Sequence, residues 1–158
     1  MKPQVGILMG SDSDSLVMEE TGKILNQFGI TYEMKILSAH RSPQLVTEYA
    51  TAAEENGMKV LICGAGGAAH LAGVAAAHTI LPVIGVPLDS ALGGVDSFVS
   101  TLQMPAGVPV ATVAIGKSGA KNAAYLAIEI LALSDVKLRE KLHGHKAEME
   151  KAVKEKNK

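Results

Sequence analysis

The side chains best suited to chemistry in this sequence are His40 and Arg41, which stand together in the segment Ser38-Ala39-His40-Arg41. An imidazole titrates near neutral pH, so His40 can both give and take a proton. The neighbouring guanidinium is a fixed positive charge that can hold a phosphate or a carboxylate. The pair therefore indicates acid–base chemistry on an anionic ligand. A surface loop in which both side chains only cap or are solvated is the alternative interpretation.

A second polar segment, Gly10-Ser11-Asp12-Ser13-Asp14-Ser15, follows an apolar run. Ser11 and Ser13 can donate hydrogen bonds near a helix N-terminus, where free backbone N–H groups favour an anion. Asp12 and Asp14 would oppose a bare phosphate, but they suit the hydroxyls of a ribose. The segment has neither the G-x-G-x-x-G nor the Walker pattern. Helix capping alone, with Ser13 or Asp14 as the N-cap, explains the segment equally well.

A glycine-rich segment, Gly64-Ala65-Gly66-Gly67-Ala68-Ala69-His70, is the third candidate. Its backbone N–H groups, at the start of a helix, can cradle a carboxylate or a phosphate. Its alanines would form a tight apolar wall that suits a small neutral molecule. Close packing of the helix on a sheet would also require these glycines. We expect His70 to lie in the first turn of the helix and to face the site.

Other reactive side chains are expected to be inert or structural. Cys63 lies in an apolar run, which predicts a small buried hydrophobe rather than a catalytic thiol. We expect His78 to be structural. His143 and His145 flank a glycine on a charged tail. We expect no zinc site there, because the tail offers no further ligands.

Short β-type runs alternate with longer helical stretches along most of the chain. The pattern predicts strands at 5–9, 32–37, 60–64, 82–86 and 110–115, and helices at 13–28, 43–57, 70–79, 95–102 and 119–134. Pro43 would open the second of these helices, where its missing N–H costs nothing. Such an alternation favours an α/β fold with a doubly wound parallel sheet and helices on both faces.

This fold explains why the polar segments belong together. In open parallel sheets, ligands bind beyond the carboxyl ends of the strands. The segments that begin at Gly10, Ser38 and Gly64 each follow a predicted strand, and so does the polar loop at 87–94. We therefore expect one small-molecule site at this edge of the sheet.

Composition and charge exclude several classes of protein. Apolar residues make up 47% of the 158 residues and charged residues 20%, which is typical of one globular domain spanning 1–158. A net charge of -1 gives no general attraction to nucleic acid or to an anionic membrane. The sequence has no signal-peptide pattern and no membrane-spanning apolar run. With a single cysteine, these features predict a cytoplasmic protein.

The segment 136–158 lies beyond the last predicted strand and helix. Lysines and glutamates alternate along most of it, which is typical of a solvated helix. Such a polar helix cannot bury much against its own domain. We expect a C-terminal helical extension that packs across a neighbouring subunit or else frays.

The segments described above, in this order, closely resemble the aminoimidazole ribonucleotide carboxylase family, in its bacterial N5-carboxyaminoimidazole ribonucleotide mutase class. The resemblance runs from about residue 4 to 134 and includes Gln103-Met104-Pro105, Ala114-Ile115-Gly116-Lys117 and Asn122-Ala123-Ala124. It implies a flavodoxin-like three-layer α/β/α sandwich of about five strands. It also implies a homo-octamer that uses no metal and no organic cofactor.

The resemblance assigns roles to individual residues. His40 matches the general acid/base, and Ser11, Asp14 and Arg41 match the residues that bind the ribonucleotide. Positions that line the same pocket in the family are matched by Asp12, Ser38, Ala39, Gly66, His70 and Leu71. The sequence departs from the family pattern at Ala72, where proline is common, and at Asp89 in a loop that is one residue short. These departures bear on loop geometry and pocket closure.

The activity implied by the resemblance is an isomerisation in purine (IMP) biosynthesis. The enzyme would convert N5-carboxyaminoimidazole ribonucleotide to 4-carboxy-5-aminoimidazole ribonucleotide by loss and recapture of CO2, with one His as proton shuttle. Arg41 and the segment 64–70 favour this mutase over direct carboxylation of the aminoimidazole ribonucleotide by CO2, which stays an alternative. A non-catalytic nucleotide-binding module on the same fold is a second alternative. A serine hydrolase is disfavoured because no G-x-S-x-G motif is present.

Overall fold

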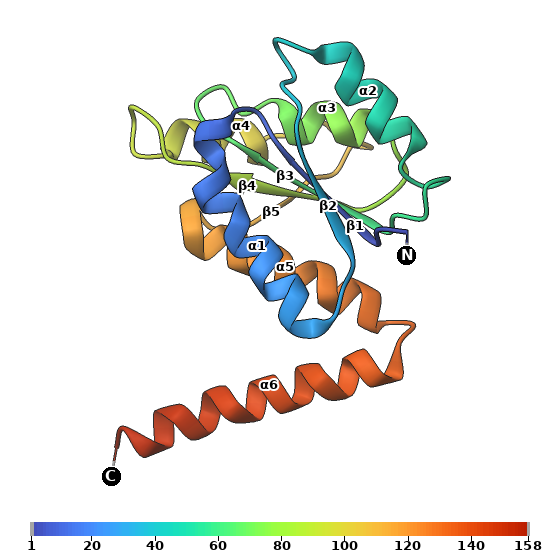
Figure 1. Ribbon diagram of the computed structural model, residues 1–158. Coiled ribbons are helices and arrows are strands. Elements are labelled where there is room, and N and C mark those ends of the chain that lie inside the picture. The colour runs from blue at the N-terminus through green and yellow to red at the C-terminus, as the bar shows by residue number, and fades with distance from the viewer. Residues whose placement is uncertain (1, 158) are drawn as a thin grey trace.

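The computed structural model describes residues 2–157 and contains a parallel sheet of five strands in the order β2-β1-β3-β4-β5 (Figure 1). The strands are β1 (Val5–Met9), β2 (Tyr32–Ile36), β3 (Val60–Ala65), β4 (Val83–Pro87) and β5 (Ala111–Thr112). The helices are a 3-10 turn η1 (Asp12–Asp14), α1 (Ser15–Phe28), α2 (Pro43–Ala52), α3 (Leu71–Ala77), α4 (Val95–Leu102), α5 (Gly116–Ala132) and α6 (Val136–Glu155). This strand order is that of flavodoxin-like folds, so the predicted fold class is confirmed.

The sheet lies between two hydrophobic clusters, one on each face. One cluster joins α1 and α5 to the sheet, and the other joins α2 and α3 to the opposite face (Figure 1). Since helices cover both faces, the central strands must be apolar on both sides. Every residue of β1 and of β4 is buried, and so are the first five residues of β3.

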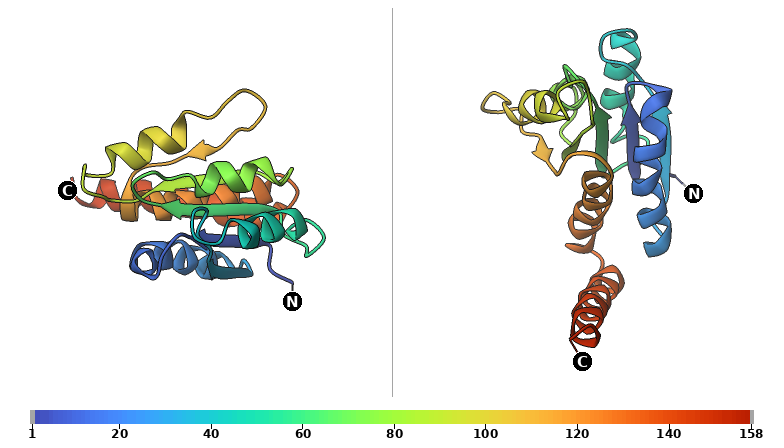
Figure 2. Two further views of the ribbon diagram at one scale, coloured as in Figure 1. Left: turned by 90° about the horizontal axis from the view of Figure 1, so that it is seen from above. Right: turned by 90° about the vertical axis from the view of Figure 1, so that its left-hand side faces the viewer.

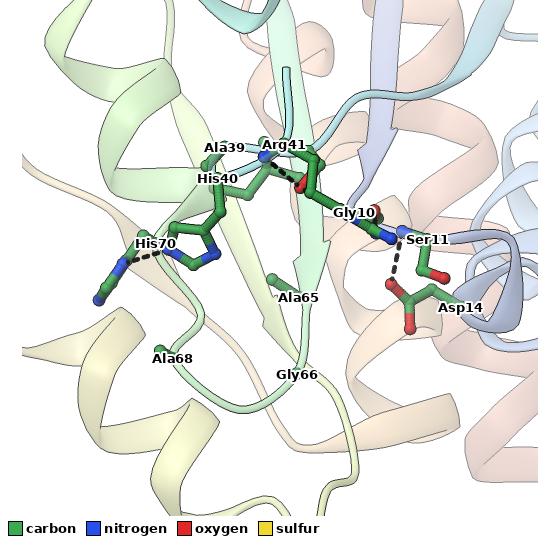
Figure 3. A pocket seen from close by; sticks show the side chains of 12 residues that line it. Gly10, Ser11, Asp14, Ala39, His40, Arg41, Ala65, Gly66, Ala68 and His70 are labelled. Atoms are coloured by element: carbon green, nitrogen blue, oxygen red, sulfur yellow. Dashed lines mark hydrogen bonds between the residues drawn. The ribbon is translucent and has the colours of Figure 1, made fainter. Parts of the chain in front are cut away.

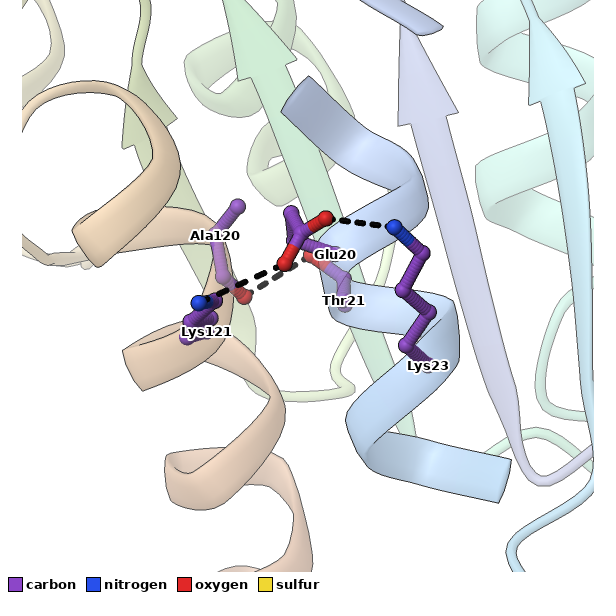
Figure 4. A network of polar contacts seen from close by, with 5 residues as sticks. All are labelled: Glu20, Thr21, Lys23, Ala120 and Lys121. Atoms are coloured by element: carbon purple, nitrogen blue, oxygen red, sulfur yellow. Dashed lines mark hydrogen bonds and ion pairs between the residues drawn. The ribbon is translucent and has the colours of Figure 1, made fainter. Parts of the chain in front are cut away.

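Helices α1 and α5 pack closely, with a buried hydrogen bond between them and ion pairs at the rim (Figure 4). The Thr21 hydroxyl is fully buried and donates to the carbonyl oxygen of Ala120 at 2.8 Å. At the rim of the contact, the Glu20 carboxylate pairs with Lys23 at 2.6 Å and with Lys121 at 3.4 Å. Small residues on α5, beginning with the fully buried Ala120, allow this approach.

Most predicted element boundaries lie within one or two residues of the observed ones. The start of α1 and three larger differences, in α2, β5 and α5, have identifiable features. A 3-10 turn precedes α1, so the α-helix begins at Ser15 rather than Ser13, and it ends as expected at Gly29, whose φ is 78°. α2 ends at Ala52 and gives way to a turn, short of the predicted residue 57. β5 covers only two residues of the predicted 110–115, because just Ala111 and Thr112 align with β4. α5 begins at Gly116, three residues before the predicted start.

The last helix, α6, lies outside the sheet and its two helix layers, beyond the end of α5 (Figure 2). The Asp135 side chain caps it by accepting from the Leu138 N–H at 3.0 Å. Leu138 is buried and His145 stacks on Tyr125, but Met149 and Val153 beyond them are exposed. This agrees with the expectation that so polar a helix buries little against its own domain. Within residues 2–157, no helix is both long and apolar enough to cross a membrane.

Candidate active site

A cavity of about 330 Å³ opens at the carboxyl edge of the sheet, beyond the ends of β1, β2 and β3 (Figure 3). This is the edge at which the sequence places the site, and the volume lies at the lower end for a small-molecule pocket. The cavity is lined by Gly10, Ser11, Asp14, Ser38, Ala39, His40, Arg41, Ala65, Gly66, Ala68, His70 and Leu71.

His40 stands on a short turn that closes on itself between β2 and α2. The Ser42 N–H donates to the Ser38 carbonyl oxygen at 2.9 Å, and the Ser38 N–H donates to the Ser42 hydroxyl at 3.0 Å. Pro43 then begins α2, as expected. The two serines therefore fix the turn, and His40 projects from it toward the cavity.

His40 meets His70 across the mouth of the cavity. His40 Nε2 and His70 Nδ1 are 2.7 Å apart, and the rings are almost perpendicular, with centroids 4.8 Å apart. His70 is the N-cap residue of α3, so it lies one position before the helix rather than within its first turn, where the sequence predicts it. Both imidazoles are exposed, so solvent and ligand can reach them.

Arg41 spans the gap between the ends of β2 and β1. Its Nη2 donates to the carbonyl oxygen of Gly10 at 2.5 Å, and its Nε donates to the Ser38 hydroxyl at 3.4 Å. These two bonds hold the guanidinium at the cavity wall and leave other N–H donors free for an anion. The Ser38 hydroxyl also accepts the Arg41 backbone N–H at 3.2 Å, so Ser38 supports Arg41 locally.

The first loop combines capping with a place at the cavity. Asp14 occupies the N-cap position of α1, one of the two positions that the sequence suggested, although its side chain makes no capping bond there. Ser11 instead caps the preceding turn η1, in a capping box with Asp14. Asp14 Oδ2 accepts the Ser11 N–H at 3.1 Å. Burial raises the pKa of Asp14, against the opposing effects of this hydrogen bond and of the Arg41 charge. Asp14 is thus a half-buried carboxyl group on the cavity wall.

Asp12 does not line the cavity, although the resemblance places it at the pocket. Its carboxylate turns back on its own loop. Oδ1 accepts the Ser13 N–H and the Ser11 hydroxyl, each at 3.0 Å. Local hydrogen bonding therefore directs Asp12 away from the ligand space.

The glycine segment packs closely on a helix at its start and lines the cavity further along. A Cβ on Gly64 would lie 2.4 Å from the Met18 sulfur, so this glycine permits close helix–sheet packing. Gly67 has a φ of 61° and open space around it, so it shapes the turn. A hydrogen bond from the Ala69 N–H to the Ser100 hydroxyl, at 3.0 Å, anchors the segment to α4. Gly66 and Leu71 lie at the cavity, as expected.

The structure thus brings together all the predicted site residues except Asp12. Gly10, Ala65 and Ala68 also line the cavity and were not singled out individually; each lies in a segment that follows a predicted strand, which is the signal for them. Cys63 lies apart from the cavity, and burial raises the pKa of its thiol to about 12. Within residues 2–157, no group of three or more His, Cys, Asp or Glu side chains is placed to hold a metal ion.

Known proteins resemble this chain over nearly its whole length. The family model described as AIR carboxylase matches residues 4–152. N5-carboxyaminoimidazole ribonucleotide mutase of Pyrococcus horikoshii is 56% identical over 99% of this chain and 88% of its own length. The protein of that name from Bacillus subtilis is 53% identical over 97% of this chain and 95% of its own length.

A solved structure confirms the likeness in three dimensions. The crystal structure of Treponema denticola PurE superposes with a TM-score of 0.87 at 31% identity, covering 97% of this chain and 95% of that one. The family model and the close relatives together establish that this chain belongs to the AIR carboxylase family.

Proposed function

We propose that this protein is an N5-carboxyaminoimidazole ribonucleotide mutase, an isomerase of purine biosynthesis. The observation that carries the proposal is His40, held by a closed turn at a cavity that also contains Arg41, Ser11 and Asp14. One acid–base group beside an anion-binding group is what an internal carboxyl transfer on a nucleotide requires. Curated relatives at more than half identity carry this name.

In the proposed mechanism, His40 begins protonated and ends protonated. The carbamate C–N bond breaks, its electron pair goes to nitrogen, and His40 gives that nitrogen a proton. The ring carbon next to it then attacks the released CO2 and forms a C–C bond. His40 removes the proton from that carbon, which restores the aromatic ring. One imidazole therefore serves as acid and then as base, and no other reactant is consumed.

The remaining site residues bind and confine the substrate. Arg41 and Ser11 are proposed to hold the phosphate, and Asp14 the ribose hydroxyls. The N–H groups around Gly66 would orient the migrating carboxylate. The proposed wall of the CO2 cage is apolar and is made by Ala39, Ala65, Ala68 and Leu71. A closed wall keeps CO2 beside the ring carbon, which supplies the advantage of proximity.

Two assays test this function against its alternatives. The carbamate substrate should be converted to the ring-carboxylated product, followed spectroscopically, without added bicarbonate. Carboxylation of the aminoimidazole ribonucleotide at physiological bicarbonate, with no carbamate present, would instead identify a direct carboxylase. Saturable nucleotide binding with no turnover, unchanged by replacement of His40, would identify a binding module.

We also infer that the protein works in the cytoplasm as a homo-oligomer of its own chain, with the octamer as the proposed state. The single cysteine is buried and unpaired, which fits a reducing compartment. α4 buries Ser97 and Thr101 but exposes Val95, Val99 and Leu102 by 58, 47 and 46%. An apolar face turned outward suits another copy of the chain, as does the free end of α6. Light scattering should give the oligomer mass, and Val99→Glu should lower it.

A further inference from the structure

The contact between His40 and His70 restricts where protons can sit on both rings. The two nitrogens, His40 Nε2 and His70 Nδ1, are 2.7 Å apart. A hydrogen bond at this distance needs one hydrogen between them, so one ring donates and the other accepts. Each neutral imidazole carries its hydrogen on one nitrogen only, so the bond decides whether the other nitrogen of neutral His40, Nδ1, carries a hydrogen or a free lone pair.

Only one of the two arrangements suits a group that alternates between cation and neutral base, as the proposed function requires of His40. If His40 Nε2–H donates to His70 Nδ1, the bond stays intact in both states of His40. The proton then enters and leaves through His40 Nδ1. If His70 donates instead, His40 Nε2 must stay unprotonated, and His40 loses this bond each time it becomes a cation.

The position of the second ring nitrogen of His40 fits the first arrangement. In Figure 3, the second ring nitrogen of His40 lies away from His70, on the side of Ala65 and the cavity. The backbone of His70 is fixed, since its N–H donates to the Ala68 carbonyl and its own carbonyl accepts the Val74 N–H, each at 2.9 Å. The backbone of His70 is therefore held at the start of α3, and the turn that carries His40 is closed by Ser38 and Ser42.

We propose that His70 is a positioning residue that acts through His40. Its Nδ1 accepts the His40 Nε2–H throughout the reaction, which makes His40 Nδ1 the nitrogen that exchanges protons with the substrate. This role rests on the proposed mutase reaction. It resembles the way in which a carboxylate orients the histidine of a serine protease by holding one ring nitrogen.

Two substitutions at His70 separate positioning from mere packing. Asn places an amide oxygen near the position of the imidazole Nδ1, so His70→Asn should keep the bond and most of kcat. His70→Leu fills the space without an acceptor, and kcat should fall by about tenfold or more with little change in KM. His78→Leu is the matched control, because His78 is exposed at the other end of α3; it should leave both constants unchanged.

A spectroscopic measurement on the free protein is independent of turnover. Long-range 1H–15N NMR of the imidazoles should show neutral His40 as the Nε2–H tautomer in the parent protein and in His70→Asn, but as a mixture in His70→Leu. An Nδ1–H tautomer of His40, or an unchanged kcat in His70→Leu, would overturn the proposal. If the parent protein does not convert the carbamate substrate, the mutase function fails, while the tautomer still decides the role of His70.

Discussion

Two carboxyl groups near the start of α1, Asp14 and Glu20, lie in opposite electrostatic settings. Asp14 lines the cavity, and burial raises its pKa. Glu20 lies at the rim of the α1–α5 contact, where the hydrogen bond from Lys23 lowers its pKa and Lys121 assists. The folded chain therefore favours the charged form of Glu20 and disfavours the charged form of Asp14.

The same contrast extends to the two regions around them. At the α1–α5 contact, the Thr21 hydroxyl and the Glu20 carboxylate are bonded within the protein, and Thr21 and Ala120 are fully buried. At the cavity, His40 and Arg41 are exposed, and each has nitrogen atoms that make no hydrogen bond within the protein. We conclude that one region maintains the fold and the other keeps capacity for a ligand, which commonly costs stability. Substitutions in the two regions should therefore affect different measurements.

The largest expected effect is on turnover, from His40→Asn. Asn can keep a polar contact on the turn but cannot carry a proton between two atoms of the substrate. Conversion of the carbamate substrate should fall by about 10²-fold or more, with nucleotide binding retained. The melting temperature should not change, because the turn is closed by Ser38 and Ser42 rather than by His40. Activity near that of the parent protein would show that His40 is not the general acid and base.

The next effect is on stability, from Ala120→Leu in the α1–α5 contact. Ala120 is fully buried and its carbonyl receives the Thr21 hydroxyl, so three extra carbons must displace one helix. The free energy of unfolding should fall by about 1–3 kcal/mol, while kcat per folded molecule stays constant. Ala77→Leu, at the exposed end of α3, is the matched control and should change neither. A loss of kcat at full stability would show that the two regions are coupled.

Much of the fold follows from local sequence. Continuous apolar runs mark β1, β3 and β4 because these strands are covered on both faces, and Gly29 marks the end of α1. The sequence predicts too long a β5 because residues after its end are also apolar. Val113, for example, is apolar because it packs against the hydrophobic cluster of α1 and α5, not because it belongs to the strand. α2 was predicted too long since Ala53 and Met58, although buried, lie in and after a turn. Burial alone does not specify a helix.

The site was predictable as a set of loops but not as a set of contacts. The edge of the sheet, and with it His40, Arg41 and His70, followed from the strand pattern. The bond between His40 and His70 did not, because it joins residues 30 positions apart that meet only when β2 and β3 flank β1. The orientation of Asp12 depends on two hydrogen bonds within its own loop, which compete with any ligand.

The smallest effect, a pH dependence of stability, gives the sharpest contrast between the two carboxyl groups. The pKa of Asp14 is raised in the folded protein, so its contribution to stability is present below its ordinary pKa of 3.8 and is lost as pH rises through the folded value. Asn does not titrate. Urea unfolding should therefore show Asp14→Asn gaining stability over the parent protein as pH rises above 3.8, although nucleotide binding weakens.

Glu20→Gln is the matched substitution with the opposite sign. The pKa of Glu20 is lowered in the folded protein, so the charged form contributes stability above its ordinary pKa of 4.5 and loses it as pH falls through the folded value. Glu20→Gln should lose stability relative to the parent protein as pH rises toward 4.5 and leave nucleotide binding unchanged. Slopes of the same sign for both variants would contradict the division between a region that keeps the fold and a region that keeps a ligand. Opposite slopes would show that two carboxyl groups only six positions apart each respond to their own hydrogen bonds and burial.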